Sequence, residues 1–247
     1  MNLAVDRIVH PTLDQIPTLD QTKARVAPTV LAHEQTMPVS ADLAPLFAER
    51  ALVRGRTLGC IGPAATSTAM ALVAATVMAG SWLAVVDVPT FGLDAASEAG
   101  IPLERVVAIT TGIDPGTAGT AGRANTSGAD WVEVMAAAVD GFDIVLSRQP
   151  SQVPHAQVTG SALRRLSTRI RQRGAVVVLL DDDEQRADMK RAHMRCDGVI
   201  ETSGISWSGL GSGYGHLQKR TLDLSASGRR LPGRRLCNLT VRGDVCA

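Results

Sequence analysis

From residue 56 onward, short apolar runs alternate with longer stretches in which apolar residues recur at helical spacing. The short runs are rich in valine and isoleucine and are largely uninterrupted by polar residues, which is typical of strands covered by helices on both faces. This alternation predicts an α/β fold with a mostly parallel sheet and right-handed crossovers. The predicted strands are 57–61, 82–88, 106–109, 143–146 and 176–180, and the predicted helices are 66–79, 93–99, 131–139 and 161–173.

The pattern is different on both sides of this region. Residues 1–38 are polar and punctuated by prolines, and they contain the related segments PTLDQI and PTLDQT, which predicts a flexible N-terminal arm. Whether that arm is a docking peptide or a leader without a role stays open at this point. An amphipathic pattern over 41–52 predicts a short helix that packs on the domain that follows. Residues 112–128 are small and polar and predict a solvent-exposed loop.

The C-terminal part of the chain is rich in glycine and serine after residue 198, which predicts two or three antiparallel strands that close the sheet. The main domain is therefore expected over 39–228, followed by a basic tail over 229–247. Apolar side chains lie among the arginines of this tail, so we expect it to contact a protein partner, while contact with nucleic acid and a solvated tail stay open as alternatives. The residues expected to form that contact are Arg229, Arg230, Leu231, Arg234, Arg235, Leu236, Leu239 and Val241.

Composition excludes several classes of protein. The net charge of +1 over 247 residues indicates no general affinity for nucleic acid or membranes, so such contacts require a local patch. The longest apolar stretch, 69–86, is broken by Gly80 and Ser81, so no membrane span is predicted. The first residues show no basic region followed by an apolar run, which predicts a cytoplasmic chain without a signal peptide.

The cysteines and histidines favour neither disulfides nor a metal centre. The 4 cysteines form no CxxC pair, which favours reduced thiols. His193 and Cys196 have the spacing of a ligand pair, but no second pair accompanies them, so no metal is expected.

The segment GCIGPAATSTAMA, residues 59–71, places a glycine turn between a strand and a helix, which is where a phosphate-binding loop would lie. Such a loop has the pattern GxxxxGK followed by Ser or Thr, with amides around the phosphates and a lysine to neutralise them. In the register that begins at Gly62, Ser67 occupies the place of the second glycine, Thr68 that of the lysine and Ala69 that of the magnesium-binding hydroxyl. Hydrolysis of ATP is not expected, although weak ATP binding is left open.

The other positions at which a nucleotide hydrolase needs acids are also altered. Asp87 closes the second predicted strand, and Ser147 and Arg148 follow the fourth, where a magnesium-binding aspartate is expected. The acidic run LLDDDE at 179–184 imitates that acid but belongs to the fifth strand, so we expect its carboxylates to cap the next helix. No catalytic residue is therefore assigned.

These segments resemble the RecA-like recombinases, and the match is closest to the ImuA family in its actinobacterial form, ImuA-prime. The resemblance extends over residues 41–230, through LVRGRTLGCIGPAATSTAMALVAATVMAG, GSWLAVVDVPTFGLDAASEAGIPLERVVAI, DGFDIVLSRQP and WSGLGSGYGHLQKRTLDLSASGR. It implies a RecA-like sheet with a degenerate phosphate loop. It also implies a non-catalytic role in damage-induced translesion synthesis, as a nucleoid-associated scaffold of the mutasome.

The partners that this resemblance implies are ImuB, an inactive Y-family polymerase homologue, and through it an error-prone C-family DNA polymerase. Contact with DNA is expected to be indirect or weak, and homo-oligomers are left open. Two alternatives remain: a cell-division inhibitor resembling SulA, which inhibition of FtsZ polymerisation would favour, and a weak ATP-binding regulator of recombination.

Two further features concern possible contacts. The predicted helix 161–173 carries five arginines beside an apolar stripe, which fits either a DNA or acidic-partner face or an ordinary solvated surface. Trp207 and Tyr214 stand out in a chain with 3% aromatic residues, and we expect them to pack under the glycine-rich hairpin rather than to stack on bases.

Overall fold

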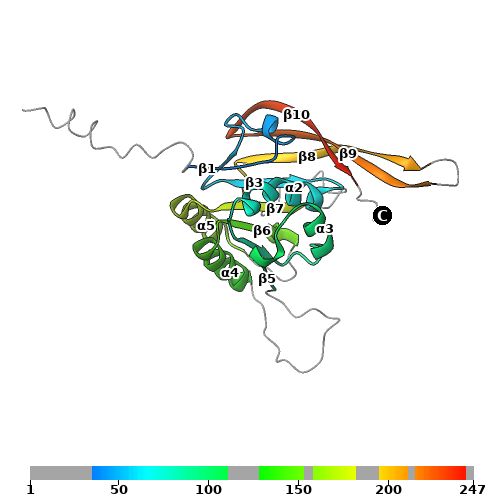
Figure 1. The fold of residues 1–247 in the computed structure, drawn as a ribbon. Coiled ribbons are helices and arrows are strands. Elements are labelled where there is room, and N and C mark those ends of the chain that lie inside the picture. The colour runs from blue at the N-terminus through cyan, green and yellow to red at the C-terminus, as the bar shows by residue number, and fades with distance from the viewer. Residues whose placement is uncertain (1–34, 111–127, 153–157, 182–194, 211–214, 243–247) are drawn as a thin grey trace, which may run out of the picture. The chain divides into compact units, whose positions relative to one another are not determined.

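The computed structural model describes residues 35–110, 128–152, 158–181, 195–210 and 215–242, all within one compact unit that begins at Gln35. Eight strands form one sheet in the order β10-β9-β8-β3-β7-β6-β4-β5 (Figure 1). Six of them run parallel: β3 (Thr57–Ile61), β4 (Leu83–Val86), β5 (Val106–Ile109), β6 (Ile144–Arg148), β7 (Val176–Asp181) and β8 (Gly198–Leu210). The last two, β9 (Gly215–Gly228) and β10 (Leu231–Arg242), are antiparallel to their neighbours. The predicted α/β architecture with antiparallel closing strands is confirmed.

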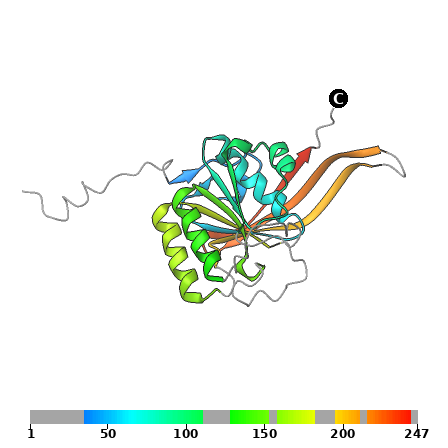
Figure 2. The ribbon, with the colours of Figure 1, turned by 90° about the horizontal axis from the view of Figure 1, so that it is seen from below.

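Helices cover both faces of the parallel part of the sheet. α2 (Ala65–Met78) and α3 (Leu93–Glu98) lie on one face, and α4 (Gly128–Gly141) and α5 (Gly160–Arg173) lie on the other (Figure 2). β7 shows how one strand serves both cores: Val176, Val178 and Leu180 join the α2 side, whereas Val177 and Leu179 join the α4 and α5 side. The uninterrupted apolar runs of the sequence follow from this double coverage.

The segment before β3 packs on α2, but not as the helix predicted over 41–52. It forms β1 (Thr36–Met37), the 3-10 turn η3 (Ala44–Leu46) and β2 (Leu52–Val53), with β1 and β2 paired antiparallel. Arg50 has a φ of 53°, which an α-helix does not accommodate. The predicted helix is wrong because tertiary packing overrides its pattern: all four apolar residues of that pattern are buried, namely Leu43, Leu46, Phe47 and Leu52.

This covering segment explains why α2 is apolar on nearly every side. Met37 is buried, and the Thr76 hydroxyl donates to the Pro38 carbonyl at 2.6 Å, so the helix is held between the sheet and the preceding segment. A helix enclosed in this way needs no polar face. Residues 35–38 of the predicted arm therefore belong to the folded domain, and residues 1–34 lie outside the described part of the chain.

The basic tail predicted over 229–247 is corrected over most of its length. Residues 231–242 form β10, which pairs with β9 along the sheet. Leu231 is buried against Gly198, where the leucine side chain leaves no room for a Cβ. The remaining tail residues, 243–247, and the predicted loop at 112–127 lie outside the described residues.

Two further 3-10 turns complete the described structure, η4 (Leu103–Arg105) and η5 (Pro150–Gln152). Across the described ranges, no helix is both long and apolar enough to cross a membrane.

Candidate functional site

The junction between β3 and α2 is shorter than a phosphate-binding loop. β3 ends at Ile61 and α2 begins at Ala65, so three residues connect them. Gly62 turns the chain with a φ of 96°, and its amide donates to the Asp181 carbonyl of β7 at 3.2 Å. Pro63 has no amide hydrogen to offer an anion. Ser67, Thr68 and Ala69 consequently lie inside the helix rather than in a loop around a ligand.

The side chains at the altered positions serve the core. Thr68 is 1% exposed, and its hydroxyl lies 3.2 Å from that of Thr202 on β8. Ala69 is fully buried, and Ser67 is half-buried. A Cβ on Gly62 would lie 2.8 Å from the Thr202 carbonyl oxygen, so β8 also closes the space beside the turn. A long cationic side chain at position 68 has nowhere to extend.

One amide of the first helical turn is also engaged. The Ala65 amide donates to the Gly62 carbonyl at 3.1 Å, whereas the Thr68 amide makes the first regular bond of the helix, to the Ala64 carbonyl at 2.9 Å. In a phosphate-binding loop the first amides of the helix point at the ligand instead. The junction thus keeps the strand, turn and helix but not the cradle.

Ser147, Asp87 and Asp181 lie at or just after the carboxyl ends of β6, β4 and β7, as the sequence predicted. Ser147, at the end of β6, is buried and donates to the Arg148 carbonyl at 3.2 Å. Asp87 follows β4 with a φ of 52°, and its amide donates to the Ile109 carbonyl at 3.0 Å. Asp181 is 5% exposed and is the last residue of β7, and the helix that its carboxylate is expected to cap lies outside the described residues. Residues 182–184 lie outside the described part of the chain.

Most of the residues predicted to bind a partner are used by the fold itself. Asp197, which is buried, accepts from the Thr57 amide at 3.1 Å and forms ion pairs with Arg229 at 3.2 Å and Arg230 at 3.4 Å. Arg235 donates to the Phe47 carbonyl at 3.3 Å. Leu231 and Leu239 are buried. The predicted contact residues that are exposed and take part in none of these contacts are Arg234, Leu236 and Val241.

The long hairpin of β8 and β9 carries an exposed aromatic side chain. Trp207 is 53% exposed, and the Arg220 guanidinium lies 5.4 Å from its ring centroid. Val241 pairs with Arg220, so the three residues form one row across β8, β9 and β10. The β8–β9 hairpin extends beyond the ends of the neighbouring strands (Figure 1). Trp207 is exposed on it, so the expectation that Trp207 packs under the hairpin is wrong. Tyr214 lies outside the described residues.

The outer face of α5 forms a second candidate surface. Arg165, Arg169, Gln172 and Arg173 line an open groove on this helix. Asp140 of α4 accepts from Arg169, and it also accepts from the Arg173 Nε at 2.9 Å. These hydrogen bonds, that from Arg169 first, lower the pKa of the Asp140 carboxyl to about 2.

The described cysteines Cys60, Cys196 and Cys237 are thiols and do not form disulfides with one another. Burial raises the pKa of Cys196 to about 12 and that of Cys237 to about 11. Among the described residues, no three His, Cys, Asp or Glu side chains gather where a metal ion could bind, and His193 lies outside them.

A protein family described as the MT3502 N-terminal domain matches residues 45–185, which is more than half of the chain. The chain belongs to this family. It is also 32% identical over 149 residues to an uncharacterised protein of Mycobacterium tuberculosis, Rv3395c. The aligned part is 60% of this chain and 64% of that protein, so the chain covers less than two thirds of its relative's length.

The MT3502 N-terminal domain match includes β3 to β7 and both candidate anion-binding places, the β3–α2 junction and α5, but it ends before β8. Sequence reasoning missed Asp140, which holds two arginines of α5, and Asp197, which binds the two arginines that precede β10. Their arginine partners lie between 29 and 33 residues away, and no local spacing marks such pairs. The Trp207–Arg220 contact likewise depends on strand register, which the sequence pattern did not define.

Proposed function

We propose that the protein is a non-catalytic, RecA-like accessory or scaffold protein of the mutasome in damage-induced translesion synthesis. The proposed partner is ImuB, which would connect the chain to an error-prone C-family polymerase at the nucleoid. The observation that carries the non-catalytic part is the burial of Thr68 and Ala69, which occupy the places of the catalytic lysine and the magnesium-binding hydroxyl. Productive phosphoryl transfer requires both groups. The partner itself rests on the resemblance to the ImuA family.

A scaffold needs exposed anchors, and the C-terminal strands provide them. Trp207 and Leu236 are 53% and 67% exposed, and Arg220 lies over the Trp207 ring. Tryptophan and arginine are the residue types that most often dominate binding energy at protein interfaces. Leu236 and Val241 have opposite parity on β10, so they belong to opposite faces of the strand. We therefore place the ImuB contact on this ribbon, with Trp207, Arg220 and Val241 on one face and Arg234 and Leu236 on the other.

The experiment measures association of the full chain with purified ImuB by calorimetry. Trp207→Ala and Leu236→Glu are expected to weaken binding by about tenfold or more each, as for interface anchors. Leu93→Glu is the matched control, because Leu93 on α3 is also exposed, at 54%, but lies away from the ribbon. Deleting residues 229–247 is a poorer test, since it removes β10 and uncovers Leu222 and Leu224 on β9.

Two outcomes would overturn the proposal. Absence of association between the unaltered chain and ImuB would remove the partner. Magnesium-dependent ATP hydrolysis by the purified chain, lost in Ser67→Ala, would remove the non-catalytic role and favour an ATP-binding regulator.

A further inference from the structure

The outer face of α5 carries a row of three exposed arginines. Arg165, Arg169 and Arg173 follow one another at intervals of four residues and so lie in one row along the helix. Arg169 and Arg173 are 47% and 57% exposed. Like charges at this spacing disfavour the helix, so the row is not explained by helix stability. The helix dipole stabilises positive charge at the C-terminus, which accounts for the arginines of the last turn but not for Arg165.

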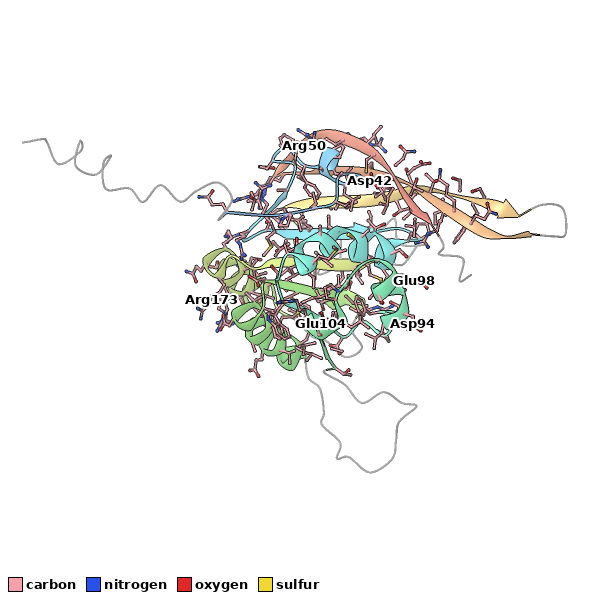
Figure 3. The ribbon with its side chains drawn as sticks, in the orientation of Figure 1. Asp42, Arg50, Asp94, Glu98, Glu104 and Arg173 are labelled. Atoms are coloured by element: carbon pink, nitrogen blue, oxygen red, sulfur yellow. The ribbon has the colours of Figure 1, made fainter. Side chains whose placement is uncertain are left out.

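Asp140 holds part of this row in place. Its two carboxylate oxygens accept from Arg169, and one of them also accepts from the Arg173 Nε. One carboxylate therefore faces two guanidinium groups, which leaves an excess of positive charge while restricting how the side chains point. Gln172 adds an amide donor to the same groove. Figure 3 shows Arg173 at the opposite side of the view from the acidic Asp94 and Glu98 of α3.

The chemistry of this face fits a polyanion better than a folded protein. The exposed large apolar side chains of the described chain lie on other elements, and none is on α4 or α5. A protein partner would lack an apolar anchor there. Arginine forks bind phosphate oxygens in a bidentate manner, which favours a phosphate-bearing ligand.

The face also lacks aromatic side chains. α5 has none in its sequence, and Trp131 of α4 is fully buried. Proteins that bind single strands usually stack bases on aromatic rings, whereas contacts to a duplex backbone need only cations and other donors. The absence of a stacking platform from this helix favours a duplex.

We propose that the outer face of α5 binds the phosphate backbone of duplex DNA without sequence preference, through Arg165, Arg169, Gln172 and Arg173. The site deepens the proposed function by giving the scaffold a direct contact with DNA. It rests on that function only for the choice of DNA among polyanions.

The test uses fluorescence anisotropy of the full chain with a labelled duplex at two salt concentrations. If three phosphates are neutralised, affinity should fall by roughly 40-fold between 50 and 200 mM salt. Arg165→Glu should weaken binding by roughly tenfold and flatten the dependence on salt. Lys219→Glu, the same change of charge at an exposed position on β9, should leave binding unaltered. Circular dichroism of each variant checks that the fold is kept, and Arg165→Ala provides a milder second variant.

Equal duplex binding by Arg165→Glu and the unaltered chain would overturn the proposal. Tighter binding to polyglutamate or to a single strand than to the duplex would do the same, and would point to an acidic protein or to single-stranded DNA instead. Calorimetry with ImuB on the same samples separates the two proposals. A chain that binds duplex through Arg165 but not ImuB loses the proposed function and keeps this site.

Discussion

Two regions of this molecule could each attract an anion, the β3–α2 junction and the outer face of α5, and the fold treats them in opposite ways. At the junction, Thr68 is 1% exposed, and Thr202 lies against both its hydroxyl and the Gly62 turn. On α5, Arg169 and Arg173 are about half exposed beside a single carboxylate, Asp140. The β3–α2 junction is part of the core, while the charged surface lies on a helix whose opposite side is buried.

The difference shows how the two kinds of site depend on the fold. A cradle of backbone amides works only if the loop remains open, and here the short connection of three residues and the packing of β8 close it. A row of long side chains needs only a helix held in place on its other face. For α5 that face is formed by Leu163, Leu166 and Ile170, all buried in the core. A strand, turn and helix can therefore be present without an amide cradle, whereas a row of arginines requires only a helix that is packed on its other side.

A lysine at position 68 should destabilise the protein rather than create an ATP-binding site. Thr68→Lys places an ammonium in the core beside Thr202, and an uncompensated buried charge costs roughly 3–5 kcal/mol of stability. Urea unfolding measures the loss, and calorimetry should show no gain in ATP affinity. Ser67→Lys is the control at a half-buried position and should cost about 1 kcal/mol or less. A stable Thr68→Lys variant that binds ATP would mean that the junction is still a usable cradle.

The turn itself should tolerate no side chain. Gly62→Ala brings a Cβ to within 2.8 Å of a backbone oxygen, and the φ of 96° is strained for alanine, so we expect a loss of about 1–3 kcal/mol. Gly80→Ala separates the two causes, because Gly80 has a φ of 110° and a Cβ added there would meet no atom within 4 Å. If both substitutions cost the same, the contact with β8 contributes nothing and the junction is less closed than described.

Removing the negative charge of Asp140 should increase the affinity of the α5 face for duplex DNA. Asp140→Asn removes the one carboxylate that faces Arg169 and Arg173, so duplex affinity should rise by about two- to fivefold, the range for exposed ion pairs. Anisotropy at low salt measures the change. Because an unfolded variant would not gain affinity, an increase cannot come from loss of structure. An affinity that falls instead would show that Asp140 is needed to hold the arginines in a binding arrangement.

The smallest effect concerns pH. The pKa of Asp140 lies at about 2 in the folded protein, below its usual value of 3.8, so its ionised form stabilises the fold above pH 4. That contribution is lost as the pH falls from about 4 towards 2. In urea unfolding, the difference in stability between the unaltered chain and Asp140→Asn should therefore be present at about pH 5 and shrink at about pH 3. A difference that does not change over this interval would mean that the ion pairs contribute nothing to stability.

The sequence predicted the parallel part of the fold closely. The bounds predicted for β5, 106–109, are those of the structure, and α2 and α5 were each placed within one residue at both ends. These elements have strong periodicity and clear boundaries, such as Gly174 in the left-handed conformation after α5. The prediction failed where contacts between distant segments decided the outcome. The segment at 41–52 has a helical pattern, yet it folds as turns and a strand because α2 requires a cover there.

For the predicted binding residues, the sequence likewise indicated the positions along the chain but not the contacts with distant segments. The sequence placed Gly62 correctly in the turn after the strand, and Ser67, Thr68 and Ala69 in the helix that follows, but it could not show that β8 fills the space beside them. It also predicted that the arginines at 229–235 contact a partner. Arg229 and Arg230 in fact neutralise the buried Asp197, and Arg235 holds the segment at Phe47.

By itself the sequence determined the order of strands and helices from residue 56 to β7, the double coverage of the sheet and the absence of the lysine and hydroxyl of a phosphate-binding loop, because all three are recorded in local periodicity and in residue identity. Only the tertiary structure decided which charges are paired, which apolar residues are buried and where anions can approach. Those properties depend on distances between residues far apart in the chain. Asp140 with its two arginines and Thr68 with Thr202 are the clearest examples, since the fold brings each pair together across 29 residues or more.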